Sequence, residues 1–108
     1  MLDPKIKVLI VDDSALMRRI LGDILSSDSR INVVGTAKDG LDCLAKIAQF
    51  SPDVITLDVE MPNKDGLATL EEIMKTKPIP VIMVSSLTQE GAQTTLKALS
   101  VEIGRAHV

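Results

Sequence analysis

Three aspartates follow two apolar runs, and together they could bind a divalent cation. Asp12 and Asp13 come directly after residues 6–11, and Asp58 closes the run over residues 54–57. If both runs are neighbouring parallel strands, their carboxyl ends meet at one edge of a sheet, where open α/β sheets bind ligands. Like charges at short range cannot all ionise cheaply without a cation. Because oxygen ligands suit hard ions, we predict an acidic Mg²⁺ pocket.

Asp58 is the predicted nucleophile of this pocket. Attack of its carboxylate on phosphorus would form an acyl phosphate. Mg²⁺ held by Asp13 and Asp58, and through water by Asp12, would offset the repulsion between the carboxylates and the incoming phosphoryl oxygens. Ser85 would donate a hydrogen bond from its hydroxyl to a phosphoryl oxygen. No residue resembles a strong general base for fast hydrolysis, which favours a lasting covalent mark over rapid turnover.

Each of these residues also has a purely structural interpretation. Asp12 and Asp13 could be turn and cap residues only. Asp58 could be a solvated acid at a strand end, and Ser85 could simply terminate a strand. Their coincidence favours a site, because three of the four predicted strands end in such oxygen-bearing side chains. The strand over residues 31–37 is expected to add no ligand.

Alternating strands and helices must position these residues. Apolar, β-branched runs predict strands over residues 6–11, 31–37 and 81–84, and another that begins at residue 54 and ends before Pro62. The run that begins at residue 54 is rich in apolar and β-branched residues, is bounded by Pro52 and Pro62, and predicts a strand buried on both faces. Strict alternation with short connections implies parallel strands and right-handed crossovers. The predicted fold is therefore an α/β doubly wound parallel sheet.

Four helices are predicted from apolar residues at three- and four-residue spacing. Asp13 or Ser14 would be the N-cap of the first helix. The second begins near Asp39, the third near residue 67, and the fourth spans about 90–99. The expected inner face of the first helix contains Met17, Ile20, Leu21, Ile24 and Leu25. That of the second contains Leu41, Leu44, Ala45 and Ala48.

Composition indicates one domain of modest negative charge. The chain has 108 residues, and 45% hydrophobic content suffices for a buried core. A formal net charge of -3 argues against nucleic acid as a partner, since no basic stripe neutralises phosphates. Cys43, the only cysteine, is expected to be a small core residue. We find no leader peptide and no apolar run of membrane length, so we expect a cytoplasmic protein without a membrane partner.

Three motifs, in this order, resemble the receiver domain of bacterial two-component response regulators. They are VDDSALMR at residues 11–18, LDVEMP at 57–62 followed by Gly66, and VSSLT at 84–88. The resemblance extends over residues 5–99. The same segments are similar to the amino-terminal regulatory domains of chemotaxis protein-glutamate methylesterases.

The resemblance implies a flavodoxin-like sheet of order 2-1-3-4 and a role in phosphoryl transfer. Asp58 would receive the phosphoryl group from a phosphohistidine on a chemotaxis-type histidine kinase. The implied Mg²⁺ ligands are Asp13, Asp58 and the backbone carbonyl of Glu60, with Asp12 acting through water. In a longer parent, phosphorylation would regulate a carboxyl-terminal protein-glutamate methylesterase domain, which we expect this chain to lack.

The end of the chain departs from the family pattern. Family members continue with a fifth strand ending in Lys-Pro and a fifth helix, whereas residues 100–108 contain no lysine and are too few for that helix. We therefore expect a receiver domain over residues 5–99 whose fifth strand and helix are missing or aberrant. Residues 100–108 are expected to be a truncated or non-native tail.

Three alternatives remain open, and a fourth, a flavin or nucleotide binder, is discarded. The parent could be another response regulator or a hybrid kinase. An aspartate-nucleophile phosphatase would use an Asp-x-Asp pair on one strand, whereas here the adjacent acids and the predicted nucleophile belong to different strands. A flavin or nucleotide binder is disfavoured because neither Gly-x-Gly-x-x-Gly nor Gly-x-x-x-x-Gly-Lys-Ser/Thr occurs. An inert fragment would keep the motifs without holding the site together.

Overall fold

Strands and helices alternate along the chain in the computed structural model, which describes residues 4–58, 66–76 and 78–84. All four predicted strands are present, and the first, second and fourth have the predicted bounds. The predicted helix over residues 90–99 lies outside the described residues. The elements, in order, are β1 (Ile6–Val11), α1 (Ala15–Ser26), β2 (Ile31–Ala37), α2 (Gly40–Phe50), β3 (Val54–Asp58), α3 (Gly66–Thr76) and β4 (Val81–Val84).

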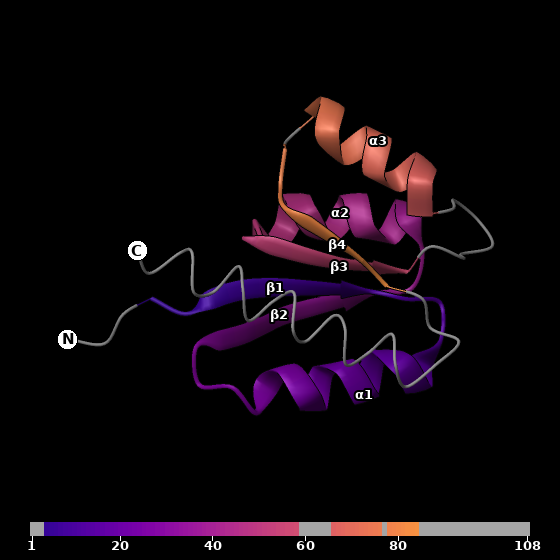
Figure 1. Cartoon of the computed structure of the whole chain (residues 1–108). Coiled ribbons are helices and arrows are strands. Elements are labelled where there is room, and N and C mark those ends of the chain that lie inside the picture. The colour runs from indigo at the N-terminus through magenta and orange to yellow at the C-terminus, as the bar shows by residue number, and fades with distance from the viewer. Residues whose placement is uncertain (1–3, 59–65, 77, 85–108) are drawn as a thin grey trace.

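The four strands form one parallel sheet in the order β2-β1-β3-β4. Helix α1 covers one face, while α2 and α3 cover the other (Figure 1). The predicted doubly wound α/β fold and strand order are therefore confirmed. The expectation of a missing fifth strand and helix concerns residues outside the described ranges.

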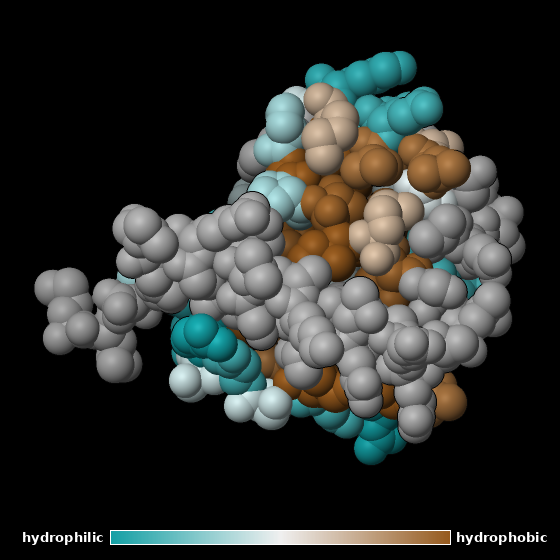
Figure 2. Space-filling model, viewed as in Figure 1, coloured by the Kyte–Doolittle hydropathy of each residue, from teal (hydrophilic) through white to brown (hydrophobic). Residues whose placement is uncertain are grey.

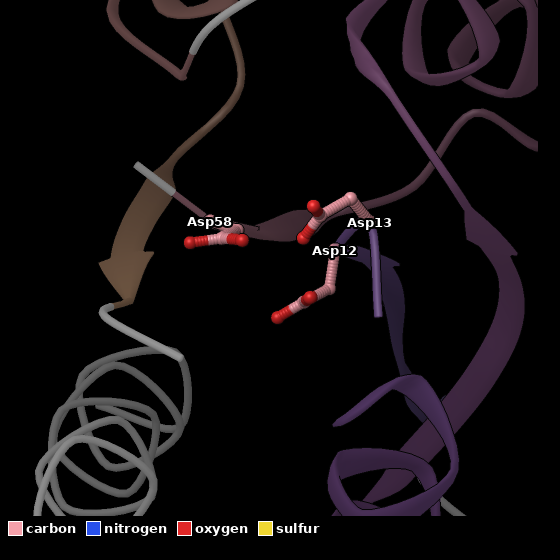
Figure 3. A group of neighbouring side chains, drawn as sticks. All are labelled: Asp12, Asp13 and Asp58. Atoms are coloured by element: carbon pink, nitrogen blue, oxygen red, sulfur yellow. The ribbon is translucent and has the colours of Figure 1, made fainter. Parts of the chain in front are cut away.

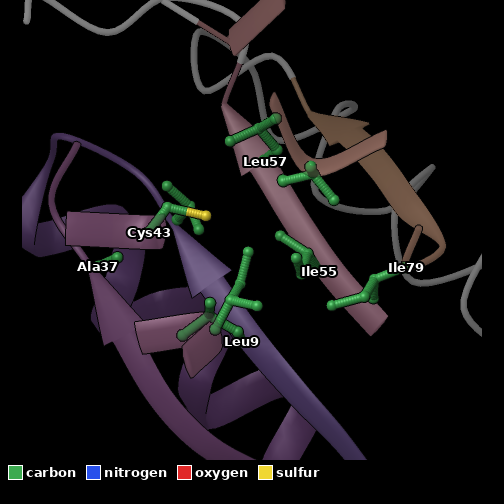
Figure 4. Packing of buried hydrophobic residues seen from close by; sticks show 9 residues of the cluster. Leu9, Ala37, Cys43, Ile55, Leu57 and Ile79 are labelled. Carbon is green, nitrogen blue, oxygen red and sulfur yellow. The ribbon is translucent and has the colours of Figure 1, made fainter. Parts of the chain in front are cut away.

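Two apolar clusters hold the helices against the sheet. Alternate residues of each strand point to opposite faces, so Leu9 and Ile55 join the cluster shown in Figure 4, whereas Val8 and Ile10 join the cluster that includes residues of α1. All five residues of β3 are buried, as the continuous apolar run predicts. This central strand therefore carries Asp58 into the interior of the fold.

The predicted inner face of α2 is wrong in part. Leu41 is 63% exposed, and Ala45 and Ala48 are also exposed. Cys43 and Ile47 are buried instead, so the expectation for Cys43 is confirmed. Apolar residues occur on more than one stripe of this helix, and the stripe that faces the sheet is decided by how α2 packs against β1, β2 and α3.

Apolar surface remains visible along β4 in the space-filling view (Figure 2). Val81, Ile82 and Met83 are only partly buried, whereas Val84 is buried next to the end of β3. Within the described ranges, none of the helices combines the length and the apolar character that crossing a bilayer requires.

Candidate functional site

Three aspartates converge at the carboxyl edge of the sheet. Asp12 and Asp13 follow β1 directly, and Asp58 is the last residue of the neighbouring β3. The parallel register pairs Val11 with Leu57, so the acids come next on both strands. One carboxylate oxygen of each aspartate lies within 4.8 Å of those of the other two (Figure 3). The adjacency of β1 and β3 therefore builds the cluster.

Asp12 is anchored by three hydrogen bonds and keeps one oxygen unused. Its amide donates to the carbonyl of Ala37 at 3.0 Å, and its Oδ1 accepts from the amide of Ser14 at 2.9 Å. Its own carbonyl accepts from Nη1 of Arg18 at 2.8 Å. Oδ2 is buried and has no hydrogen-bond partner among the described residues. Asp12 is thus a turn residue, as the structural interpretation proposed, that still offers one buried oxygen.

Burial raises the pKa of Asp12 to about 6. The hydrogen bond from the Ser14 amide favours the charged form and opposes this shift, while the nearby negative charges of Asp58 and Asp13 add to it. Near neutral pH, the cluster therefore holds a charge that its protein surroundings disfavour. A bound cation would relieve that cost.

Exposure differs among the three acids. Asp58 is only 1% exposed and Asp12 is fully buried, whereas Asp13 is exposed. The interpretation of Asp58 as a solvated acid at a strand end is therefore wrong. The exposed member places the cluster beside solvent, so a small ligand can approach it.

The donor set fits a hard divalent cation. All three side chains offer carboxylate oxygens, and Asp12 Oδ2 is a buried acceptor without a partner among the described residues. Mg²⁺ takes one or two carboxylates and keeps several waters, which matches two buried acids beside an exposed one. The other predicted site residues, Glu60 and Ser85, lie outside the described residues.

Two local features refine what the sequence predicts. Ser14, and not Asp13, is the N-cap of α1, because its hydroxyl accepts from the amide of Met17 at 3.2 Å. Asp13 is thereby left out of the cap. The sequence interpretation assigned no role to Arg18, which reaches back to the end of β1. A basic residue within one turn of the helix start was the available signal, but its partner depends on the tertiary path of the chain.

Comparison with known proteins identifies the family. The family model of the response regulator receiver domain matches residues 8–105 of this chain. The chain belongs to the receiver domain family. The resemblance to receiver domains is thereby confirmed. The receiver domain is also similar to solved structures of its family: the response regulator domain of Thermotoga maritima CheB is 55% identical, with a TM-score of 0.73 over 89% of this chain and 72% of that one.

Curated relatives place this receiver near the chemotaxis methylesterases, as the sequence motifs implied. It is 59% identical over 95 residues to the protein-glutamate methylesterase/protein-glutamine glutaminase of Symbiobacterium thermophilum, covering 88% of this chain and 26% of that protein. It thus spans about a quarter of that relative's length. It is also 35% identical to Borrelia burgdorferi CheY, solved in a complex with CheX, BeF3 and Mg²⁺, with a TM-score of 0.71 over 87% of this chain and 72% of that chain.

Proposed function

We propose that this receiver domain accepts a phosphoryl group on Asp58 from a histidine kinase, with Mg²⁺ bound beside it. The observation that carries the proposal is the burial of Asp58 within 4.8 Å of oxygens from Asp12 and Asp13. Such a cluster has little structural reason to exist unless a cation offsets its charge. The Mg²⁺ in the complex of the related CheY supports the same assignment.

In the proposed reaction, an oxygen of Asp58 attacks phosphorus. A phosphorus–oxygen bond forms as the phosphorus–nitrogen bond to the donor histidine breaks, and its electron pair returns to the imidazole. Bound Mg²⁺ would offset negative charge on the phosphoryl oxygens. Asp13 would ligate the ion, and Asp12 would act through water. The Ser85 hydroxyl would donate to a phosphoryl oxygen, and the Glu60 carbonyl would complete the metal site.

The relatives also support a proposal for the parent protein and its partners. We propose a chemotaxis-type histidine kinase as donor and, in a longer parent, a carboxyl-terminal protein-glutamate methylesterase domain under control of residues 5–99. The names of the curated relatives and the similarity to a CheB receiver support this assignment. We propose a cytoplasmic location, where such a kinase would act.

Intact-mass measurement after incubation with phosphoramidate tests the function. We expect the mass of one phosphoryl group to be added in the presence of Mg²⁺, and none after chelation. Asp58→Ala should abolish the addition, because the nucleophile is lost. Asp53→Ala is the matched control, since this exposed acid lies before β3 and should leave the addition unchanged. Addition that persists in Asp58→Ala would refute the assigned nucleophile.

A further inference from the structure

Arg18 links the first turn of α1 to the end of β1. Its Nη1 donates to the backbone carbonyl of Asp12 at 2.8 Å, and the side chain is partly buried. Its amide also donates to the carbonyl of Ser14 at 3.0 Å as the helix begins. Arg18 therefore spans the turn that carries two of the three clustered acids.

We propose that Arg18 is a positioning residue for the cation site. Its guanidinium holds the backbone of Asp12 so that the carboxylate of Asp12 stays within the acidic cluster formed with Asp13 and Asp58. The inference rests on the proposed function, since it assigns Arg18 a role in the cation site formed by Asp12, Asp13 and Asp58.

The argument begins with the carbonyl of Asp12. The chain changes from strand to helix at this point, and among the described residues Arg18 supplies the donor for this carbonyl. A guanidinium donates a charge-assisted bond, which is stronger than a neutral one, and it stays protonated throughout the physiological range. The bond therefore persists whatever the protonation of the neighbouring acids.

The other bonds to Asp12 come from backbone atoms. The Ala37 carbonyl accepts from its amide, and the Ser14 amide donates to its Oδ1. Arg18 is thus the one cationic side chain that donates a hydrogen bond to Asp12 among the described residues. Carboxylates at close range repel one another, so a loosened backbone would let Asp12 turn away from the cluster. Hydrogen-bond partners that orient the ligands of a metal ion are known to affect metal affinity, and Arg18 would act on Asp12 in this way.

Titration with Mg²⁺ of the ¹⁵N-labelled chain and three variants, followed by NMR, tests the proposal. We expect Arg18→Ala to raise the dissociation constant for Mg²⁺ about tenfold, the lower end of the loss seen when outer-shell partners of metal ligands are removed. Arg18→Lys keeps a donor and the charge and should recover part of this loss. Arg19→Ala removes the same charge from the exposed neighbour on α1 and should change affinity less than about twofold.

A second readout needs no metal. Amide exchange at Ser14 reports the bond to Asp12 Oδ1, and it should be faster in Arg18→Ala than in the parent or in Arg19→Ala. Equal loss of Mg²⁺ affinity in both alanine variants would overturn the inference, because net charge would then explain it. A lower melting temperature with unchanged affinity of the folded protein would also overturn it.

The two proposals fail in different ways. If the parent chain does not bind Mg²⁺ at all, the proposed function fails. The positioning of Asp12 is then decided by exchange alone: faster exchange at Ser14 in Arg18→Ala supports it, and unchanged exchange refutes it. If the parent binds Mg²⁺ and Arg18→Ala binds it equally well, the inference fails while the proposed function stands.

Discussion

Aspartates at the two ends of the sheet lie in opposite environments. Asp28, in the connection that leads into the amino end of β2, is bound by Arg30 through Nη2 at 2.6 Å and Nε at 3.0 Å. These bonds lower the pKa of Asp28 to about 2. Asp12, at the carboxyl end of β1, has a pKa raised to about 6 by burial, with no cationic side chain bound to its carboxylate among the described residues.

The contrast shows where acids support the fold and where they oppose it. Lowering the pKa of an acid in the native state adds stability at neutral pH, whereas raising it removes stability. Asp53 also supports the fold, since its Oδ2 accepts a hydrogen bond from the amide of Lys7 at 2.8 Å before β3 begins. The protein therefore keeps a costly charge at the carboxyl edge, as expected for a functional site.

The largest effect should come from neutralising the buried acid. Asp12→Asn keeps the acceptor for the Ser14 amide and removes the buried charge, so unfolding without Mg²⁺ at pH 7 should cost about 2 to 3 kcal/mol more than in the parent. Urea unfolding measures this. The native pKa of Asp12 is above its ordinary value of 3.8, so parent stability should fall as pH rises from about 4 to about 6.

Urea unfolding measured over a range of pH separates the titration of Asp12 from a general effect of net charge on stability. In Asp12→Asn, the fall in stability between about pH 4 and pH 6 should be much smaller. Asp13→Asn is the matched control, because that acid is exposed and its neutralisation should change stability less. Equal pH slopes in the parent and in Asp12→Asn would contradict the contrast between the two ends of the sheet.

Mg²⁺ should reverse the cost at the carboxyl edge. At a free concentration ten times its dissociation constant, a ligand that binds only the native state adds about 1.4 kcal/mol of stability. The expected result is a higher melting temperature by circular dichroism, lost again on chelation. In Asp58→Ala, Mg²⁺ should raise the melting temperature less than in the parent, since one ligand of the cluster is gone. An equal rise in that variant would place the ion elsewhere.

Asp39, which follows the carboxyl end of β2, extends the comparison to an acid that caps a helix. Asp39 is 8% exposed, and its Oδ1 accepts from the amide of Asp42 at 2.8 Å as the N-cap of α2. Asp39→Ala should lower the free energy of unfolding by about 1 kcal/mol, whereas Asp39→Ser should restore the cap. Urea unfolding of both variants decides this. No loss in the alanine variant would show that the cap contributes little.

The smallest effect is expected at the amino end. Asp28→Asn should lower stability by less than about 1 kcal/mol, because the side chains of Asp28 and Arg30 are 24% and 46% exposed and water screens the pair. The stabilisation by the pair of Asp28 and Arg30 should be present above about pH 4 and lost as pH falls toward 2, where Asp28 becomes protonated. Unfolding at low and high salt tests it: the difference should shrink with salt, and a salt-independent loss would point to backbone bonding instead.

The sequence by itself determined the strands and their parallel direction, and the resemblance of its motifs to receiver domains implied the strand order. Continuous apolar runs defined β1 to β4, and parallel neighbours must bring Asp12, Asp13 and Asp58 to one edge. Apolar runs and the direction of their connections predicted parallel strands, whereas the adjacency of β1 and β3 was implied by the resemblance to receiver domains. Glu60 and Ser85 stay predictions, since they lie outside the described residues.

Tertiary structure decided which helix face is buried and which groups hold Asp12. Leu41 and Cys43 are both apolar residues of α2, and only the packing of that helix leaves the first exposed and buries the second. The bond from Arg18 to Asp12 and the raised pKa of that acid likewise depend on distances between residues on different elements. Periodicity reports one element at a time, whereas burial and hydrogen bonding are set by how elements meet.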